Sequence, residues 1–390
     1  MLYWMSAGSA VRFVSALCAV FATTAVQKFV VLELVVILLK RKRETSAVVL
    51  ETVLSNWTES ALAVVAAWTG QNVLGPTFLV GATTINQLVL LGACFIHGGH
   101  HSGATSYPKL MASIHARALP AGLALLAYAA VSNAGSEVSS EKRPRVYCIT
   151  AILLLLYFAG HVFFVCRLHS NISLAVSGLL SPSDPNMSVN CRNSDLLPNS
   201  FSGRIGVSQI WHLRDEKEAW LRGWLSLDSD SEKGQPSDSA IAVLTLLLSC
   251  IATLFLGAQF VNTLAAEDTG SWQSPLHAGY ILLPLSTSAA GLIAVQLHGC
   301  GCTSAVFHGQ ALFASVLSTF HLLCFTLPVF VLTRWATAPG PSLEFFDVHQ
   351  LGLLAIASLL PLYPMQRGSD DWHMGVALLF LYVLYVSCFW

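Results

Sequence analysis

Most of this chain consists of apolar runs about twenty residues long, which are separated by short polar segments. A helix needs about 20 mostly apolar residues to cross the hydrocarbon core of a membrane. The pattern therefore predicts a protein that crosses the membrane many times. We predict spanning helices near residues 51–70, 74–96, 118–134, 146–168, 241–263, 277–297, 309–333, 349–364 and 373–390.

The N-terminal apolar stretch, residues 8–39, is longer than one span requires. Its length allows one helix and a second short one, with an interruption at Gln27-Lys28. The fold prediction is thus an all-α polytopic membrane protein with ten or eleven transmembrane helices.

A polar segment at residues 169–240, rich in Ser, Asp, Asn and Pro, separates two apolar halves. Such a composition is typical of a solvated linker rather than a packed domain. We predict an N-terminal transmembrane half over residues 1–168, a cytosolic linker over 169–240 and a C-terminal transmembrane half over 241–390.

Composition supports the membrane prediction, because 54% of the residues are hydrophobic and only 11% are charged. The net charge of −1 gives no global field that would attract nucleic acid. The only close cysteine pair, Cys300-Gly301-Cys302, has a spacing that suits zinc poorly. We therefore predict the lipid bilayer as a partner, with no nucleic acid, no cofactor and no metal centre.

Orientation follows from the basic cluster Lys40-Arg41-Lys42-Arg43, because positive loops stay in the cytosol. Alternating from that cluster places the linker in the cytosol and the C-terminal Trp390 on the opposite side. The basic loop at Lys142, Arg143 and Arg145 argues against this orientation.

Two polar residues stand out in the apolar run 51–70: Asn56 and Glu59 lie about one helical turn apart. An ionisable group inside the membrane is costly, so it usually faces the interior of the bundle and marks an ion path. The corresponding run of the second half, near residues 284–295, carries no charge. Glu59 is therefore the first candidate for a functional residue.

Residues 55–59 (SNWTE), a turn at 70–75 and residues 81–92 (GATTINQLVLLG) form a set of polar and glycine-rich motifs. They are similar to the first repeat of the calcium/proton exchangers of the cation/calcium exchanger superfamily. Leu282-Leu283-Pro284 and Phe325-Thr326-Leu327-Pro328 resemble parts of its second repeat. The resemblance implies two inverted five-helix repeats of the sodium/calcium exchanger type, and a vacuolar or other internal membrane.

The chain departs from the family pattern at the positions where the chemistry occurs. In place of the second-repeat acid it has Gly291, at the end of Thr287-Ser288-Ala289-Ala290-Gly291. A family polar motif appears as Leu317-Ser318-Thr319-Phe320-His321. Acids before the second repeat appear as Gln259 and Asn262, and Glu51 lies two turns before Glu59.

Calcium needs about six to eight oxygen ligands, with carboxylates to offset its charge. A single carboxylate suits a monovalent cation or a proton better. The resemblance therefore implies a cation/proton antiporter with altered selectivity, in which His321 relays a proton and Glu51, Gln259 and Asn262 are secondary residues. The predicted ion-binding residues are Asn56, Glu59, Asn86, Ser288, Ser318 and Thr319.

Three other hypotheses remain open from the sequence. Glu59 is a protonated relic of an ion site, hydrogen-bonded to Asn86. Alternatively, a protonated Glu59 beside aromatic walls is the acid of an intramembrane cyclase or isomerase that acts on a small lipophilic molecule. In the third hypothesis the chain is a regulatory membrane protein that transports nothing.

Overall fold

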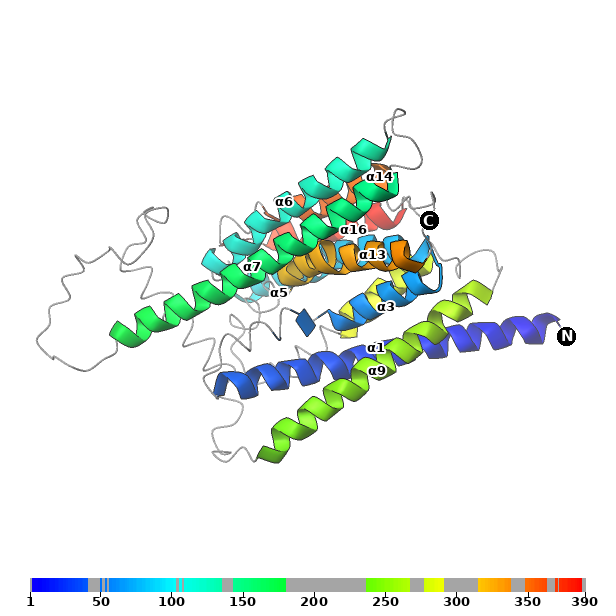
Figure 1. The fold of residues 1–390 in the computed structure, drawn as a ribbon, viewed down its shortest axis with the longest axis horizontal. Coiled ribbons are helices and arrows are strands. Elements are labelled where there is room, and N and C mark those ends of the chain that lie inside the picture. Colours follow the sequence, from blue (N-terminus) through cyan, green and yellow to red (C-terminus); the bar gives the residue numbers. More distant parts are fainter. Residues whose placement is uncertain are drawn as a thin grey trace, which may run out of the picture.

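The chain folds into a bundle of helices (Figure 1). The computed structural model describes residues 2–40, 50, 53–54, 56–102, 105–106, 109–134, 143–179, 236–266, 277–290, 315–337, 348–362, 369–370 and 372–387. A helical bundle suits an apolar solvent, because helices satisfy their backbone hydrogen bonds internally. The two-residue strands β1 (Thr105–Ser106) and β2 (Ser369–Asp370) pair with each other in antiparallel fashion.

Five helices among the described residues are long and apolar enough to cross a membrane. They are Val11–Val31, Leu74–Ile96, Arg145–Phe164, Ile241–Leu264 and Ser315–Thr337. Shorter apolar helices cover Ala118–Ser132, Ala278–Ala290, Gln350–Leu359 and Trp372–Ser387. The predicted all-α membrane architecture is confirmed.

The N-terminal prediction of a break at Gln27-Lys28 was wrong. Helix α1 runs unbroken over Leu2–Lys40 and contains the single span Val11–Val31. A polar side chain uses no backbone hydrogen bond of its helix, so polarity alone does not end a helix. Gln27 and Lys28 instead direct their polar groups toward helix α3 (Trp57–Trp68).

The bundle has central and peripheral helices. In each of the central spans, Leu74–Ile96 and Ser315–Thr337, 78% of an 18-residue stretch is buried inside the structure. For α1, α7 (Arg143–Leu179) and α9 (Pro236–Ala266) the share is only 22–28%. Figure 1 shows α1 and α9 crossing along one side of the bundle, where they pack against each other. Their exposed apolar side chains are those expected of a lipid-facing surface.

Two helices extend into the residues that the sequence assigned to the linker. Helix α7 continues past residue 168 to Leu179, and α9 begins at Pro236. Residues 180–235 lie outside the described residues, so the linker and its cytosolic location stay predictions. The proposed location of Trp390 also lies outside them.

The first-repeat pair comprises α3 and the span that contains α4 (Leu74–Thr84), the π-helical segment η1 (Ile85–Leu90) and part of α5 (Leu91–Ser102). Between α3 and α4 the chain turns at Gly70, whose φ of +79° lies in the left-handed region that glycine adopts without steric cost. The N–H of Gln71 donates to the carbonyl of Ala66 at 2.9 Å and closes the end of α3.

Each helix of the second-repeat pair packs against the first-repeat helix that is not its counterpart. Gly279 lies against Thr77, and Ser288 bonds Asn86, so the span Ala278–Ala290 runs in the same direction as α4. Likewise, Ser318 bonds Asn56 and Thr326 bonds Ser60, so Ser315–Thr337 runs in the same direction as α3. Because α3 and α4 are consecutive helices joined by a tight turn, each second-repeat helix opposes its first-repeat counterpart. The predicted inverted repeat is present in these contacts.

The remaining helices pack around this centre. Helix α6 (Lys109–Ala134) contacts α7, which contacts α13 (Leu327–Thr337). Helix α14 (Val348–Leu359) contacts α4 and α6, and α16 (Trp372–Ser387) contacts α5. A main apolar core built from both halves surrounds the polar residues described next.

Candidate functional site

Glu59 lies in the first turn of α3 and is 2% exposed. The helix begins after Asn56, whose carbonyl accepts the N–H of Ser60 at 3.0 Å. An acidic side chain is favourable in a first helical turn, because the free N–H groups there carry partial positive charge. The polar start of the predicted span 51–70 thus positions a buried carboxylate at a helix end.

The carboxylate of Glu59 forms an ion pair with Lys28 of α1. The Lys28 Nζ donates to Glu59 Oε1 at 3.0 Å, and the Lys28 side chain is 18% exposed. Among the described residues, Glu59 Oε2 is buried and has no hydrogen-bond partner. The site therefore contains one carboxylate, one ammonium group and one acceptor oxygen that is still available.

Gln27 fixes the same turn of α1 to the start of α3. The Thr58 hydroxyl donates to Gln27 Oε1 at 2.6 Å, and Gln27 Nε2 donates to the Leu54 carbonyl at 3.4 Å. Gln27 and Thr58 are each 1% exposed. Because the Thr58–Gln27 hydrogen bond is buried, it holds the turn of α1 that carries Lys28 beside Glu59.

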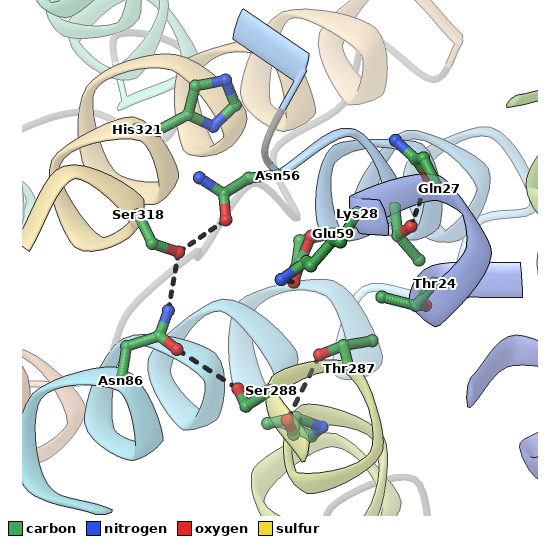
Figure 2. A network of polar contacts seen from close by, with 12 residues as sticks. Thr24, Gln27, Lys28, Asn56, Glu59, Asn86, Thr287, Ser288, Ser318 and His321 are labelled. Carbon is green, nitrogen blue, oxygen red and sulfur yellow. Dashed lines mark hydrogen bonds and ion pairs between the residues drawn. The ribbon is translucent and has the colours of Figure 1, made fainter. Parts of the chain in front are cut away.

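On the other side of Glu59, Asn86 joins both second-repeat helices (Figure 2). Its Nδ2 donates to Ser318 Oγ at 2.8 Å, and its Oδ1 accepts from Ser288 Oγ at 3.2 Å. Ser318 Oγ in turn donates to Asn56 Oδ1 at 2.5 Å. The Ser315 hydroxyl also donates to the Asn86 backbone carbonyl. Four predicted ion-binding residues thus form one connected network.

Thr319 and His321 lie beside this network without entering it. Thr319 Oγ1 accepts from Gln87 Nε2 at 2.7 Å. His321 Nδ1 is 3.3 Å from Thr326 Oγ1, which is 2.7 Å from Ser60 Oγ. The predicted relay residue is therefore linked through Thr326 to the residue after Glu59, rather than to its carboxylate. Its ring is fully buried and packs edge-on against Phe158, with centroids 5.5 Å apart.

π-Helical segments occur in three of the central helical stretches. They are η1, which contains Asn86 and Gln87, η5 (Ala278–Leu282), and η6 (Leu322–Thr326), which follows His321. Such segments widen one turn and are frequent at functional sites. In η1 the widened turn carries two amides that both bond the second half.

Two of the predicted secondary residues lie outside this network. Gln259 and Asn262 are on the exposed surface of α9 and make no contact with this network that the structure shows. Glu51 and Gly291 lie outside the described residues. The relic hypothesis placed a hydrogen bond between Glu59 and Asn86, whereas the Asn86 amide is bonded to Ser318 and Ser288.

Sequence reasoning missed Lys28, Gln27, Thr58 and Thr326. The available signal was the Gln27-Lys28 pair inside an otherwise apolar run, because a charged residue in a span normally has a partner. The pair was interpreted as a break in the helix instead.

The family model described as "Sodium/calcium exchanger protein" matches residues 11–167. This part carries Lys28, Asn56, Glu59 and Asn86, whereas the serines of the network follow in the second half.

One curated relative is a vacuolar cation/proton exchanger 1c of Oryza sativa subsp. japonica. It is 22% identical over 328 residues, which are 80% of this chain and 60% of the relative. The alignment thus spans less than two thirds of the length of that relative.

Two solved structures share the fold. Native YfkE is 16% identical with a TM-score of 0.66, over 98% of this chain and 92% of that one. The H⁺/Ca²⁺ exchanger CAX is 10% identical with a TM-score of 0.62, over 97% of this chain and 81% of that one. Both structures match almost the whole chain, including the second half.

Proposed function

We propose that the chain is a member of the cation/calcium exchanger superfamily and works as an exchanger-type membrane transporter. The activity proposed for it is the exchange of a cation for protons at Glu59. The observation that carries this proposal is the buried Glu59 carboxylate beside a hydrogen-bond network that joins both halves of the inverted repeat. A carboxylate at the crossing of two repeats is where a secondary transporter binds its ion.

Supporting geometry comes from the neutral oxygens of the site. Asn56, Asn86, Ser288 and Ser318 supply amide and hydroxyl oxygens, all provided by helix segments that meet beside Glu59. Such oxygens replace the hydration shell of a small cation, and the one carboxylate that the described part of the chain places there offsets one positive charge. A divalent ion would keep an uncompensated charge in an apolar bundle. We infer that selectivity is altered from calcium toward a monovalent cation.

The intramembrane-enzyme hypothesis requires a neutral acid beside aromatic rings. The Glu59 carboxylate instead bonds an ammonium group, while the aromatic side chains of Phe158 and Phe325 pack on His321. These contacts favour transport over acid catalysis at Glu59.

The proposed location is an internal membrane such as that of the vacuole. This is supported by the vacuolar exchanger among the relatives and by the family resemblance of the sequence. Expression of the full chain with a fluorescent tag at one end is expected to label an endomembrane rather than the cell surface.

Replacing Glu59 with Gln is expected to abolish exchange. Glutamine keeps an acceptor oxygen for Lys28 but removes the carboxylate charge that, among the described residues, offsets a bound cation. The measurement is proton flux into proteoliposomes loaded with a pH-sensitive dye, driven in turn by gradients of NaCl, KCl and CaCl₂. We expect Glu59→Gln to lower the wild-type flux by at least about 100-fold, which corresponds to about 2.7 kcal/mol.

Gln259→Ala is the matched control, because Gln259 is an exposed polar residue of α9 that the structure places outside the network. Its flux is expected to stay within about twofold of wild type, since substitutions on such surfaces change little. Equal flux above that of protein-free liposomes in wild type and Glu59→Gln would contradict the role of Glu59, and wild-type flux no greater than that of protein-free liposomes for every ion would favour a protein that transports nothing.

A further inference from the structure

The cation that Glu59 binds in this structure belongs to the protein itself. Lys28 Nζ is 3.0 Å from Glu59 Oε1. A carboxylate that binds its substrate by charge cannot be fully available while an ammonium group is bound to it. Any transported cation must therefore compete with Lys28 for Glu59.

We propose that Lys28 is a tethered cation that competes with the transported ion for Glu59 and so restricts transport to monovalent cations. This inference rests on the proposed function, because it concerns the selectivity of the same site. It names a residue on α1, outside the two interleaved helix pairs, as the specificity-determining group.

Charge supports this role. The Lys28–Glu59 pair is neutral overall, and the side chains of the neighbouring network, Asn56, Asn86, Ser288 and Ser318, are uncharged. The site is thus electrically satisfied without any bound ion. A monovalent cation that enters replaces an equal charge at Glu59, whereas a divalent cation brings a second charge that no described carboxylate offsets.

Geometry supports the competition. The Glu59 carboxylate is almost fully enclosed, but the Lys28 side chain is 18% exposed and approaches from the peripheral helix α1. Lysine has a long flexible stem and a compact charge, so its ammonium can leave the carboxylate without movement of the helix. Gln27 meanwhile keeps the backbone of that turn in place through Thr58 and Leu54.

The second carboxylate oxygen defines where the competitor binds. Glu59 Oε2 is buried, and within the described residues it has no hydrogen-bond partner. A buried acceptor is costly when it is left without a partner, so it favours a cation that approaches it. A small monovalent ion at Oε2 can first share the carboxylate and then displace Lys28.

The test compares wild type, Lys28→Gln and Lys28→Arg in proteoliposomes. Proton flux driven by NaCl or KCl is measured while CaCl₂ is titrated as a competitor. Glutamine retains an N–H donor for Glu59 without the charge, so Ca²⁺ should inhibit Lys28→Gln at concentrations at least about tenfold lower than for wild type. Arginine retains the charge, so Lys28→Arg should discriminate against Ca²⁺ as wild type does.

If Lys28→Gln does not accumulate in the membrane, Lys28→Asn provides a second neutral variant that retains an N–H donor, and thermal unfolding in detergent shows which variants are folded. If a folded neutral variant keeps Glu59-dependent flux that Ca²⁺ inhibits as in wild type, the proposed role of Lys28 is overturned. The proposed function is not affected by that result. Absence of any Glu59-dependent flux overturns this inference together with the proposed function.

Discussion

Removing the Lys28 ammonium alone is expected to destabilise the fold more than removing both charges of its pair. Lys28→Met leaves the Glu59 carboxylate at 2% exposure without its cation, and breaking a buried pair in this way costs on the order of 3–5 kcal/mol. The double variant Lys28→Met with Glu59→Gln leaves no charge behind, so much of that loss should be recovered.

The two single variants should differ from each other. Glu59→Gln leaves an ammonium group whose side chain is already 18% exposed, and a lysine can extend its head group toward a wetter surface. Its loss of stability should therefore be smaller than that of Lys28→Met. Thermal unfolding of the four proteins in one detergent completes a double-mutant cycle. Additive losses would show that Lys28 and Glu59 do not interact energetically.

Sequence reasoning predicted the network residues because local motifs carry them. Asn56 and Glu59 share one short run, and Asn86, Ser288 and Ser318 occupy motif positions that the family resemblance marks as polar. Hydrophobic runs predicted the helices, since each span must be apolar over about 20 residues. What these signals share is that they are local in the chain.

The Lys28 contact was beyond such signals, because its partner is 31 residues away on another helix. An apolar run indicates that a helix is buried in lipid or protein, but it does not indicate which neighbour each face of the helix contacts. This missing information on helix faces also explains why Gln259 and Asn262 were predicted as secondary site residues. Their amides matched positions of family acids, yet α9 presents them on its exposed surface. Assigning helix faces required the packing of α1 and α9, which composition does not encode.

A close approach of backbone to backbone between the repeats predicts a second large effect, at Gly81 of α4. A Cβ atom added there would lie 2.5 Å from the carbonyl oxygen of Tyr280 and 2.9 Å from that of Gly279. These are backbone atoms, so the helices themselves must separate. Overpacking of this kind costs about 3 kcal/mol or more when no side chain is able to move aside. Gly81→Ala is therefore expected to lower the midpoint of thermal unfolding strongly.

Gly160→Ala is the control, because Gly160 is also helical but has no atom within 4 Å of an added Cβ. Alanine favours a helix over glycine by about 1 kcal/mol, so this variant should unfold at the same temperature or higher. Equal midpoints for the two variants would show that the repeats do not approach so closely at Gly81.

Asn86 and Ser288 bond each other at the same crossing, so a separation at Gly81 should also lengthen their contact. The folded fraction of Gly81→Ala is then expected to show weaker cation-driven proton flux, which links the closeness of the repeats to the site between them.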